Sequence, residues 1–498
     1  MKLSTGIFLV SSLVGAAVAV PLAPGPRDLP LVESNKLRRA LHRKVLLEHA
    51  EKYQSFADST PDRNRVAGSV GHNMTVDYLY ETLAATGYYN VNKQPFTYIF
   101  SKGNASFSAL SKTYDSNYFD YSPSTGGSTL IAPLAKVANL GCDQSDYPDL
   151  TGKIALISRG TCDFGLKVAR AGTAGAVGAV IYNNAPGAIG GGTLREISRP
   201  EGPYVPVAGI SGTDGAALIT AMESGTVEGK LLVNSVTEVR YTNNVCAITK
   251  GGDQNNIIMS GGHSDSVAAG PGINDNGSGS LGNLEIALQL TKWSVKNAVR
   301  FCFWSAEEFG LLGSDYYIEN LPETERAKIA LYLNFDMIAS PNFGYFLYDG
   351  DGSAFNITGP PGSDAIEHLF EEYFEEVGLP TRPTAFSGRS DYGPFLKVGI
   401  PSGGIFTGAE GIKTTEQAAL WGGQAGVAYD INYHKASDDV NDLNLGAWIQ
   451  NTKAAAHAIA TYALSTEDIP KRNPSKRVKR DKNHTIPGAC GSEPVHVA

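Results

Sequence analysis

The sequence predicts an α/β protein with helices on both faces of a sheet, together with a segment of different texture at residues 129–236. After residue 255, continuous apolar runs alternate with long helical segments, as expected for such a sheet. Between residues 129 and 236, short Val, Ile and Leu runs instead lie between Gly- and Ala-rich turns. A length of 498 residues, 42% of them apolar and 18% charged, suits two or three folded domains.

The N-terminus predicts export. Lys2 precedes the apolar run Ile7–Val20, which contains the small-residue pattern Ala17-Val18-Ala19 of a cleavable secretory signal over residues 1–19. The run is too short to cross a bilayer well, and no other long uncharged apolar segment follows. We expect a secreted, extracellular protein with no membrane partner, the vacuole being the second choice of compartment. A buried N-terminal helix is the alternative interpretation of the run, and residues 20–34 are expected to be a short pro-segment or linker.

The distribution of charge argues against a nucleic-acid partner. The chain has 41 Lys and Arg against 50 Asp and Glu, a formal net charge of −9, and its only dense basic run lies in residues 468–498. A nucleic-acid-binding domain would carry a basic face. We expect residues 468–498 to be a solvated tail, and we hypothesise that a processing protease removes it.

The first part of the main domain, residues 35–128, begins with helices. Asn35–Phe56 carries apolar residues at roughly helical spacing and predicts one amphipathic helix, and a second is predicted at Gly71–Thr86. Val91–Phe100 alternates in polarity, which is typical of a strand.

The sequence of the module at residues 129–236 carries no cluster of histidine or acidic residues, so we expect it to do no chemistry itself. Cys142 and Cys162 flank its first predicted strand, Lys153–Ser158, and are the best candidates for a disulfide in an exported protein. A helix at Leu166–Ala174 and a strand at Val177–Tyr182 follow.

Export also makes the glycosylation sequons relevant, since they mark surface loops in secreted proteins. The candidates are Asn73, Asn104, Asn356 and Asn483. A fifth sequon begins at Asn276, inside a Gly-rich turn, and we expect it to be buried and unmodified.

The second part of the main domain, residues 237–467, contains continuous apolar runs, which are typical of strands covered on both faces. The predicted strands are Ile257–Ser260, Val299–Ser305 and Leu331–Phe335. The predicted helices are Ser278–Trp293, Asp364–Val377 and Leu443–Leu464.

Each of these three strands leads into side chains that can bind a metal. In an open α/β sheet, ligands bind in the crevice at the carboxyl ends of the strands. His263, the pair Glu307-Glu308 and Asp336 follow the three strands in turn. A Gly-rich turn adds Asp275, and His434 precedes the last helix.

Two histidines and three carboxylates exceed the three protein ligands of a single catalytic zinc ion. They suit two ions, with one carboxylate bridging and one histidine and one carboxylate left for each ion. The sequence therefore predicts two Zn²⁺ per chain, with Co or Mn as possible substitutes because of the carboxylate content.

Six segments, taken in order, carry a resemblance to a known family. They are Gly262-His-Ser-Asp-Ser266, Gly272-Ile-Asn-Asp-Asn-Gly-Ser-Gly279, Ser305-Ala-Glu-Glu-Phe-Gly-Leu-Leu-Gly-Ser314, Asn334-Phe-Asp-Met-Ile338, Gly388-Arg-Ser-Asp-Tyr392 and Tyr433-His434. The chain resembles the co-catalytic zinc aminopeptidases of the aminopeptidase Y and secreted fungal leucine aminopeptidase type over most of its mature length. The resemblance implies a three-layer α/β/α zinc-exopeptidase fold with a mixed central sheet, and an inserted protease-associated (PA) domain at 129–236.

The resemblance also implies how the ligands are shared. Asp275 would bridge the ions, with His263 and Asp336 on one ion and Glu308 and His434 on the other. The family has a cis peptide after the bridging residue, here Asp275–Asn276.

Further residues receive catalytic roles from the same resemblance. Glu307 would be the general base, and Asp265 would accept a hydrogen bond from His263 and fix its tautomer. Tyr433 would donate to the oxyanion, and Arg389 would bind substrate by orienting its carbonyl, or would pair with an acidic neighbour.

The function that these motifs predict is that of a hydrolase, an extracellular metallo-aminopeptidase. It would remove N-terminal residues, leucine and other apolar residues among them, from peptides and proteins by attack of a hydroxide formed between two zinc ions. We expect a monomer. Two alternatives remain: a metallo-carboxypeptidase of the same fold, and a non-catalytic peptidase-like ectodomain. A single-zinc glutaminyl cyclase is disfavoured by the full two-metal ligand set.

Overall fold

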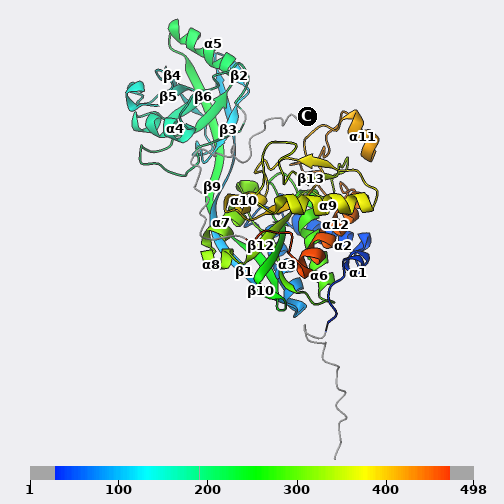
Figure 1. The fold of residues 1–498 in the computed structure, drawn as a ribbon. Helices are drawn as coiled ribbons and strands as arrows, with labels where there is room; N and C mark the ends of the chain where they lie inside the picture. The colour runs from blue at the N-terminus through cyan, green and yellow to red at the C-terminus, as the bar shows by residue number, and fades with distance from the viewer. Residues whose placement is uncertain (1–28, 190, 472–498) are drawn as a thin grey trace, which may run out of the picture.

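The computed structural model describes residues 29–189 and 191–471; the predicted signal peptide, Asn483 and residues 472–498 of the predicted tail lie outside them. Figure 1 shows a larger α/β lobe and a smaller lobe, joined by two long strands. These are β1 (Tyr89–Ala109) and β9 (Glu228–Thr249), which pair antiparallel along their length.

The larger lobe is built on a mixed sheet with strands in the order β14-β13-β15-β12-β10-β11-β9, and β1 pairs with β9 beyond them. Its four inner strands β15, β12, β10 and β11 are parallel, whereas β13 is antiparallel to β15 and β9 to β11. The bounds are β10 Asp253–His263, β11 Asn297–Trp304, β12 Ile329–Phe335, β13 Phe346–Tyr348, β14 Arg382–Thr384 and β15 Ser402–Phe406.

Apolar side chains project from both faces of this sheet, as the continuous apolar runs predict. Ile258 and Leu331 belong to the core on one face, and Met259 and Trp304 belong to the core on the other. The helices of the first face are α1 Ser34–Arg39, α2 Arg43–Asp58, α3 Val70–Ala85, α6 Gly279–Leu290, α9 Ser363–Glu376 and α12 Leu445–Leu464. On the second face lie α7 Leu312–Asn320 and α10 Tyr392–Lys397, and the connections hold α8 Glu323–Arg326 and α11 Thr415–Trp421. The predicted three-layer α/β/α fold with a mixed sheet is confirmed.

One predicted helix differs. The segment expected to form a single helix over Asn35–Phe56 is two helices, α1 and α2, and His42 between them has an extended backbone. Leu37, Leu41 and Leu46 are all buried in the same core. The break between the two helices allows all three side chains to point into it. An apolar period alone does not reveal such a change of direction.

The smaller lobe continues from β9 as a second sheet, in the order β9-β4-β5-β6-β8-β3-β7. Helices α4 and α5 pack against β6, and the disulfide joins Cys142 to Cys162, the predicted pair. The bounds are β2 Lys112–Tyr114 (paired with β1), β3 Asn117–Asp120, β4 Leu130–Lys136, β5 Ile154–Ser158, α4 Phe164–Thr173, β6 Gly178–Tyr182, β7 Gly192–Thr193, β8 Val207–Ile210 and α5 Gly212–Glu223.

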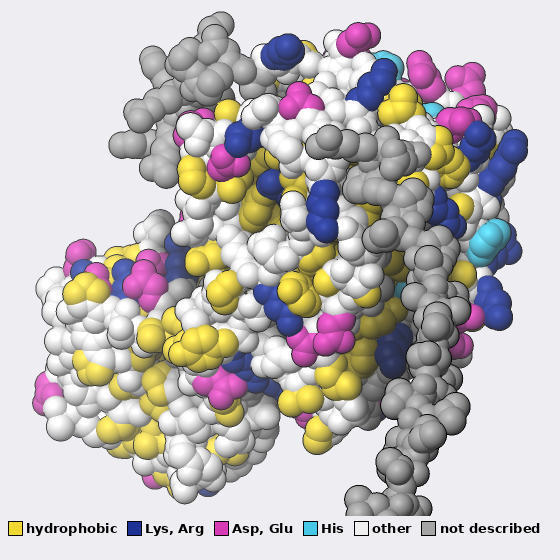
Figure 2. Space-filling model, turned by 90° about the horizontal axis from the view of Figure 1, so that it is seen from below, with side chains coloured by type: hydrophobic (Ala, Val, Ile, Leu, Met, Phe, Trp, Pro, Cys, Tyr) yellow, Lys and Arg dark blue, Asp and Glu magenta, His cyan; other side chains and the backbone are white. Residues whose placement is uncertain are grey.

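The surface carries charges of both signs. On the face seen in Figure 2, acidic and basic side chains are interspersed among polar and apolar ones. Within the described residues, none of the helices combines the length and the apolar character that crossing a membrane requires.

Candidate active site

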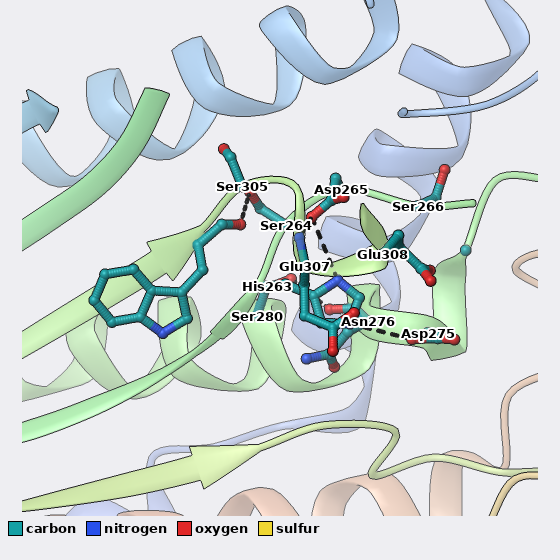
Figure 3. A network of polar contacts seen from close by, with 12 residues as sticks. His263, Ser264, Asp265, Ser266, Asp275, Asn276, Ser280, Ser305, Glu307 and Glu308 are labelled. Atoms are coloured by element: carbon teal, nitrogen blue, oxygen red, sulfur yellow. Dashed lines mark hydrogen bonds and ion pairs between the residues drawn. The ribbon is translucent and has the colours of Figure 1, made fainter. Parts of the chain in front are cut away.

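The parallel strands bring three of the predicted site segments to one edge of the sheet. His263 is the last residue of β10, and Asp336 follows β12 directly. After β11, Ala306 adopts a left-handed backbone (φ 60°) and starts a short turn of helix that carries Glu307 and Glu308. Figure 3 shows the Glu307-Glu308 pair and Asp275 beside the His263 imidazole, with contacts on it from Asp265 and Asp275.

Asp275 lies on an irregular, buried turn. The short helical segment Ile273–Ser278 is kinked, because Asp275 and Asn276 within it have non-helical backbones, and the Asp275–Asn276 peptide is cis, as the resemblance implies. Asn276 is fully buried, and its amide group donates to the Phe335 carbonyl at 2.9 Å and accepts from the Gly279 amide at 2.8 Å. Its side chain therefore fixes this turn to the end of β12 and stays out of solvent, as expected for that sequon.

The two carboxylate oxygens of Asp275 face different histidines. Oδ1 lies 3.2 Å from His263 Nε2, and Oδ2 lies 3.3 Å from His434 Nε2. On the outer sides, Asp336 Oδ1 is 3.5 Å from His263 Nε2 and Glu308 Oε2 is 3.2 Å from His434 Nε2. All five predicted ligands are thus brought together, with Asp275 in the middle.

This donor arrangement fits metal ions. Atoms about 2 Å from a tetrahedral zinc ion lie about 3.3 Å from one another, which matches the separations around Asp275. Among the described residues, the buried atoms His263 Nε2 and Asp336 Oδ1 take part in no hydrogen bond, as expected of atoms reserved for a ligand. The donors are imidazole nitrogens and carboxylate oxygens with no thiolate, a set that zinc accepts.

Glu307 lies beside this donor set. Its Oε2 is 3.8 Å from His263 Nε2, farther than the Asp275 or Asp336 oxygens. Burial raises the pKa of Glu307 well above its usual value, and the neighbouring carboxylates Glu308 and Asp336 raise it further. Burial also raises the pKa of Glu308, to about 7. So many buried carboxylates favour the presence of cations.

Asp265 is fully buried behind His263, but its geometry differs in detail from the predicted hydrogen bond. Its Oδ1 is 3.6 Å from His263 Nδ1, a charge contact longer than a hydrogen bond, and it accepts the backbone N–H of Glu307 at 3.2 Å. Asp265 therefore connects the histidine to the Glu307 backbone.

Tyr433 and Arg389 form a further group beside His434. The rings of Tyr433 and His434 stack with their centroids 3.8 Å apart. Arg389 donates to the Tyr433 hydroxyl oxygen at 3.3 Å and pairs with Glu410 at 2.7 Å. Arg389 thus contacts both an acidic neighbour and the residue predicted to stabilise the oxyanion.

Sequence reasoning missed two contacts that shape the site. Ser390 donates to Asp336 Oδ2 at 2.6 Å and fixes its orientation; its position inside the segment Gly388–Tyr392 was the available signal. A second disulfide joins Cys246 on β9 to Cys302 on β11, the strand that leads to Glu307. No spacing pattern could have revealed it, because it depends on which strands are neighbours.

The comparisons with known proteins agree with this geometry. Residues 244–459 match peptidase family M28, and residues 130–218 match the PA domain. A protein of Aspergillus fumigatus named probable leucine aminopeptidase 2 is 53% identical over 94% of this chain and 93% of its own length. The chain belongs to peptidase family M28.

Solved structures of similar fold accompany this M28 match. An aminopeptidase from Aneurinibacillus sp. strain AM-1 aligns with a TM-score of 0.66 and 26% identity, over 89% of this chain and 98% of its own. BSAP, a zinc aminopeptidase from Bacillus subtilis, aligns with a TM-score of 0.57 and 25% identity, over 84% and 98% of the two chains. The predicted family and the inserted PA domain are confirmed.

Proposed function

We propose that this M28 peptidase removes N-terminal residues, leucine and other apolar ones among them, from peptides, using two zinc ions held by His263, Asp275, Glu308, Asp336 and His434. The observation that carries the proposal is the placement of Asp275, whose two oxygens each face a different histidine. A single ion would use only one of the two pairs, Asp275 with His263 or Asp275 with His434. The class of enzyme, a zinc-dependent metallo-aminopeptidase, is confirmed by the family and by relatives similar over nearly the whole chain.

The ions and the chain divide the chemistry. Bound at these donors, zinc would supply the Lewis acidity that acidifies a water and polarises the scissile carbonyl. Glu307 is the carboxylate placed beside the donors without being needed as one. It takes the proton of the attacking water and returns it to the leaving amine, a role that typically contributes about 10²–10⁴-fold in rate.

Tyr433 acts on the carbonyl oxygen. Because Arg389 donates to its hydroxyl oxygen, the hydroxyl hydrogen is free to point at an acceptor on the substrate. A donor aimed at the developing oxyanion stabilises the transition state more than the ground state. Arg389 thereby acts on the substrate through Tyr433 and binds Glu410 at the same time.

The compartment and the rest of the chain suit this activity. Two disulfides, Cys142–Cys162 and Cys246–Cys302, favour an oxidising environment, and together with the N-terminal signal pattern they support secretion. Among the sequons, Asn73, Asn104 and Asn356 are exposed and remain proposed glycosylation sites.

A pair of substrates tests the proposed function. Purified enzyme would be given leucine 4-nitroanilide and its N-acetylated form, with and without a zinc chelator. We expect hydrolysis of the free amine only, loss of activity with chelator, and recovery when zinc is returned. A fall of about 10²–10⁴-fold in kcat is expected for Glu307→Gln, which keeps the shape of the side chain but cannot accept the proton.

The matched control is Glu367→Gln. Glu367 is a nearly buried glutamate on α9 that accepts backbone N–H groups from Gly350 and Asp351 and contacts none of the predicted ligands. This variant should keep wild-type kcat. Equal turnover of the acetylated substrate, or full activity in Glu307→Gln, would contradict the proposal, and release of C-terminal residues from an N-blocked peptide would favour the carboxypeptidase alternative.

A further inference from the structure

The segment between His263 and Asp275 is largely buried although it forms no regular secondary structure before Ile273. It runs from the end of β10 to the kinked turn that carries Asp275. Its backbone groups therefore have no ladder or helix to satisfy them, yet buried backbone groups need partners. Two charged side chains from distant parts of the chain provide these partners.

The first is Arg65, whose guanidinium is fully buried. Its Nε donates to the Pro271 carbonyl at 2.9 Å and Nη2 to the Gly272 carbonyl at 2.6 Å, and Nη1 donates to the Ser264 carbonyl. These three carbonyls lie at the two ends of the segment, directly after His263 and shortly before Asp275. The Arg65 backbone also pairs with Ser266, accepting from its N–H and donating to its Oγ.

The packing around Arg65 explains why the charge is tolerated. The guanidinium lies over the Tyr53 ring at 4.4 Å, and its nearest acidic groups include Asp265 and Asp438. Arginine presents planar donors in a fixed fork, so one side chain can hold several carbonyls at set positions. A lysine has one terminal nitrogen and cannot reach both ends of the segment in the same way.

The second is Asp438, which is 2% exposed and lies four residues after His434. Its Oδ1 accepts the backbone N–H of Asn274 at 2.7 Å, and its Oδ2 accepts the N–H of Asp275 itself at 3.1 Å. Its own carbonyl accepts the N–H of Ile273 at 3.2 Å. Asp438 therefore joins the loop that carries His434 to the turn that carries Asp275.

The two loops are also in direct backbone contact. A Cβ atom placed on Gly270 would lie 2.2 Å from the Lys435 carbonyl oxygen, so no larger residue fits there. The spacing between the loop of His434 and the segment that ends in Asp275 is thus set by close packing as well as by hydrogen bonds.

We propose that Arg65 and Asp438 are positioning residues that together fix the bridging carboxylate of Asp275 between His263 and His434. Arg65 donates to carbonyl groups at both ends of the segment and so fixes it relative to His263. Asp438 accepts N–H groups of the segment and so fixes it relative to His434. Neither side chain is needed as a metal ligand. The inference rests on the proposed function of the site, because it takes two-metal binding as the reason why Arg65 and Asp438 hold Asp275 in place.

Zinc affinity measured by competition with a chromogenic chelator tests the inference. Asp438→Asn keeps one acceptor oxygen but replaces the other with a donor, and we expect zinc affinity to fall about 10–100-fold, the usual effect of losing a contact behind the ligands. Asp438→Ala should lose at least as much. Arg65→Lys should show a comparable fall in zinc affinity. In all three variants the factor by which kcat falls should exceed the factor by which KM rises.

The control is again Glu367→Gln, because Glu367 accepts two adjacent backbone N–H groups, at 2.8 and 3.2 Å, as Asp438 does. Both glutamine and asparagine variants should lower the melting temperature, but only the Asp438 variant should lose zinc. Wild-type zinc affinity in folded Asp438→Asn and Arg65→Lys would overturn the inference while leaving the proposed function intact. Failure of the wild-type chain to bind zinc at all would instead refute the proposed function.

Discussion

His72 is a titratable side chain on α3 that is buried against β9 and the loop after β10. It is fully buried, with Nε2 3.1 Å from the Ser264 hydroxyl and Nδ1 3.3 Å from that of Thr242. Burial lowers its pKa to about 4, against about 6.5 in the unfolded chain. Since the unfolded state then takes up the proton first, stability is retained above pH 6.5 and lost as pH falls from 6.5 toward 4.

The size of this effect follows from the two pKa values. At pH 5 the single histidine should cost about 2 kcal/mol of unfolding free energy, and at pH 4 about 3 kcal/mol. His72→Gln removes the titration while keeping a group able to contact Ser264. Its unfolding free energy should therefore depend less on pH than that of the wild type.

Urea unfolding at pH 7, 6 and 5, followed by fluorescence, would measure the difference between the two proteins. We expect the wild type to be the more stable at pH 7 and to lose about 2 kcal/mol relative to His72→Gln by pH 5. Parallel stability curves for the two proteins over this range would refute the reasoning, since they would mean that His72 has the same pKa folded and unfolded.

Two further predictions concern catalysis and stability. Tyr433→Phe keeps the stacking on His434 but removes the hydroxyl, so kcat for leucine 4-nitroanilide should fall about 10²–10³-fold with little change in KM, and a kcat within a factor of three of wild type would exclude the oxyanion role. Replacing Cys246 and Cys302 together by Ala removes a link between residues 56 apart and should cost about 2–4 kcal/mol in urea unfolding. Unchanged urea midpoints in that double variant would show that the link adds nothing to stability.

Much of the fold could be predicted because its strands are covered on both faces. The runs at Ile257–Ser260 and Leu331–Phe335 lie within β10 and β12, and the run at Val299–Ser305 lies within β11 except for its last residue. By contrast, β9 was not predicted as a strand. Most of its length belongs to a two-stranded ribbon with exposed positions such as Val239 and Tyr241, so its sequence lacks a continuous apolar run.

Some residues of the candidate site could likewise be predicted from the sequence, and others could not. Residues at strand ends, such as His263 and Asp336, follow from the position of the strands alone. Arg65 and Asp438 do not, because each acts on a segment about 200 or 160 residues away and no local pattern marks that contact. The same holds for Glu410, which becomes relevant only once the fold places it beside Arg389.

The ribbon of β1 and β9 has a consequence for how the PA domain could be gained or lost. Its register is unbroken from Tyr89↔Thr249 to Ala109↔Gly229, and about 21 residues of extended strand span about 70 Å. The chain therefore enters and leaves the smaller lobe through directly opposed positions, as at the tip of a hairpin. Cutting at the pair Ser101↔Thr237 and closing with a two-residue turn would excise the lobe while leaving the register of the catalytic sheet as it is. The smaller lobe is thus an insertion at the end of a β-hairpin, and the base of that hairpin is part of the catalytic sheet.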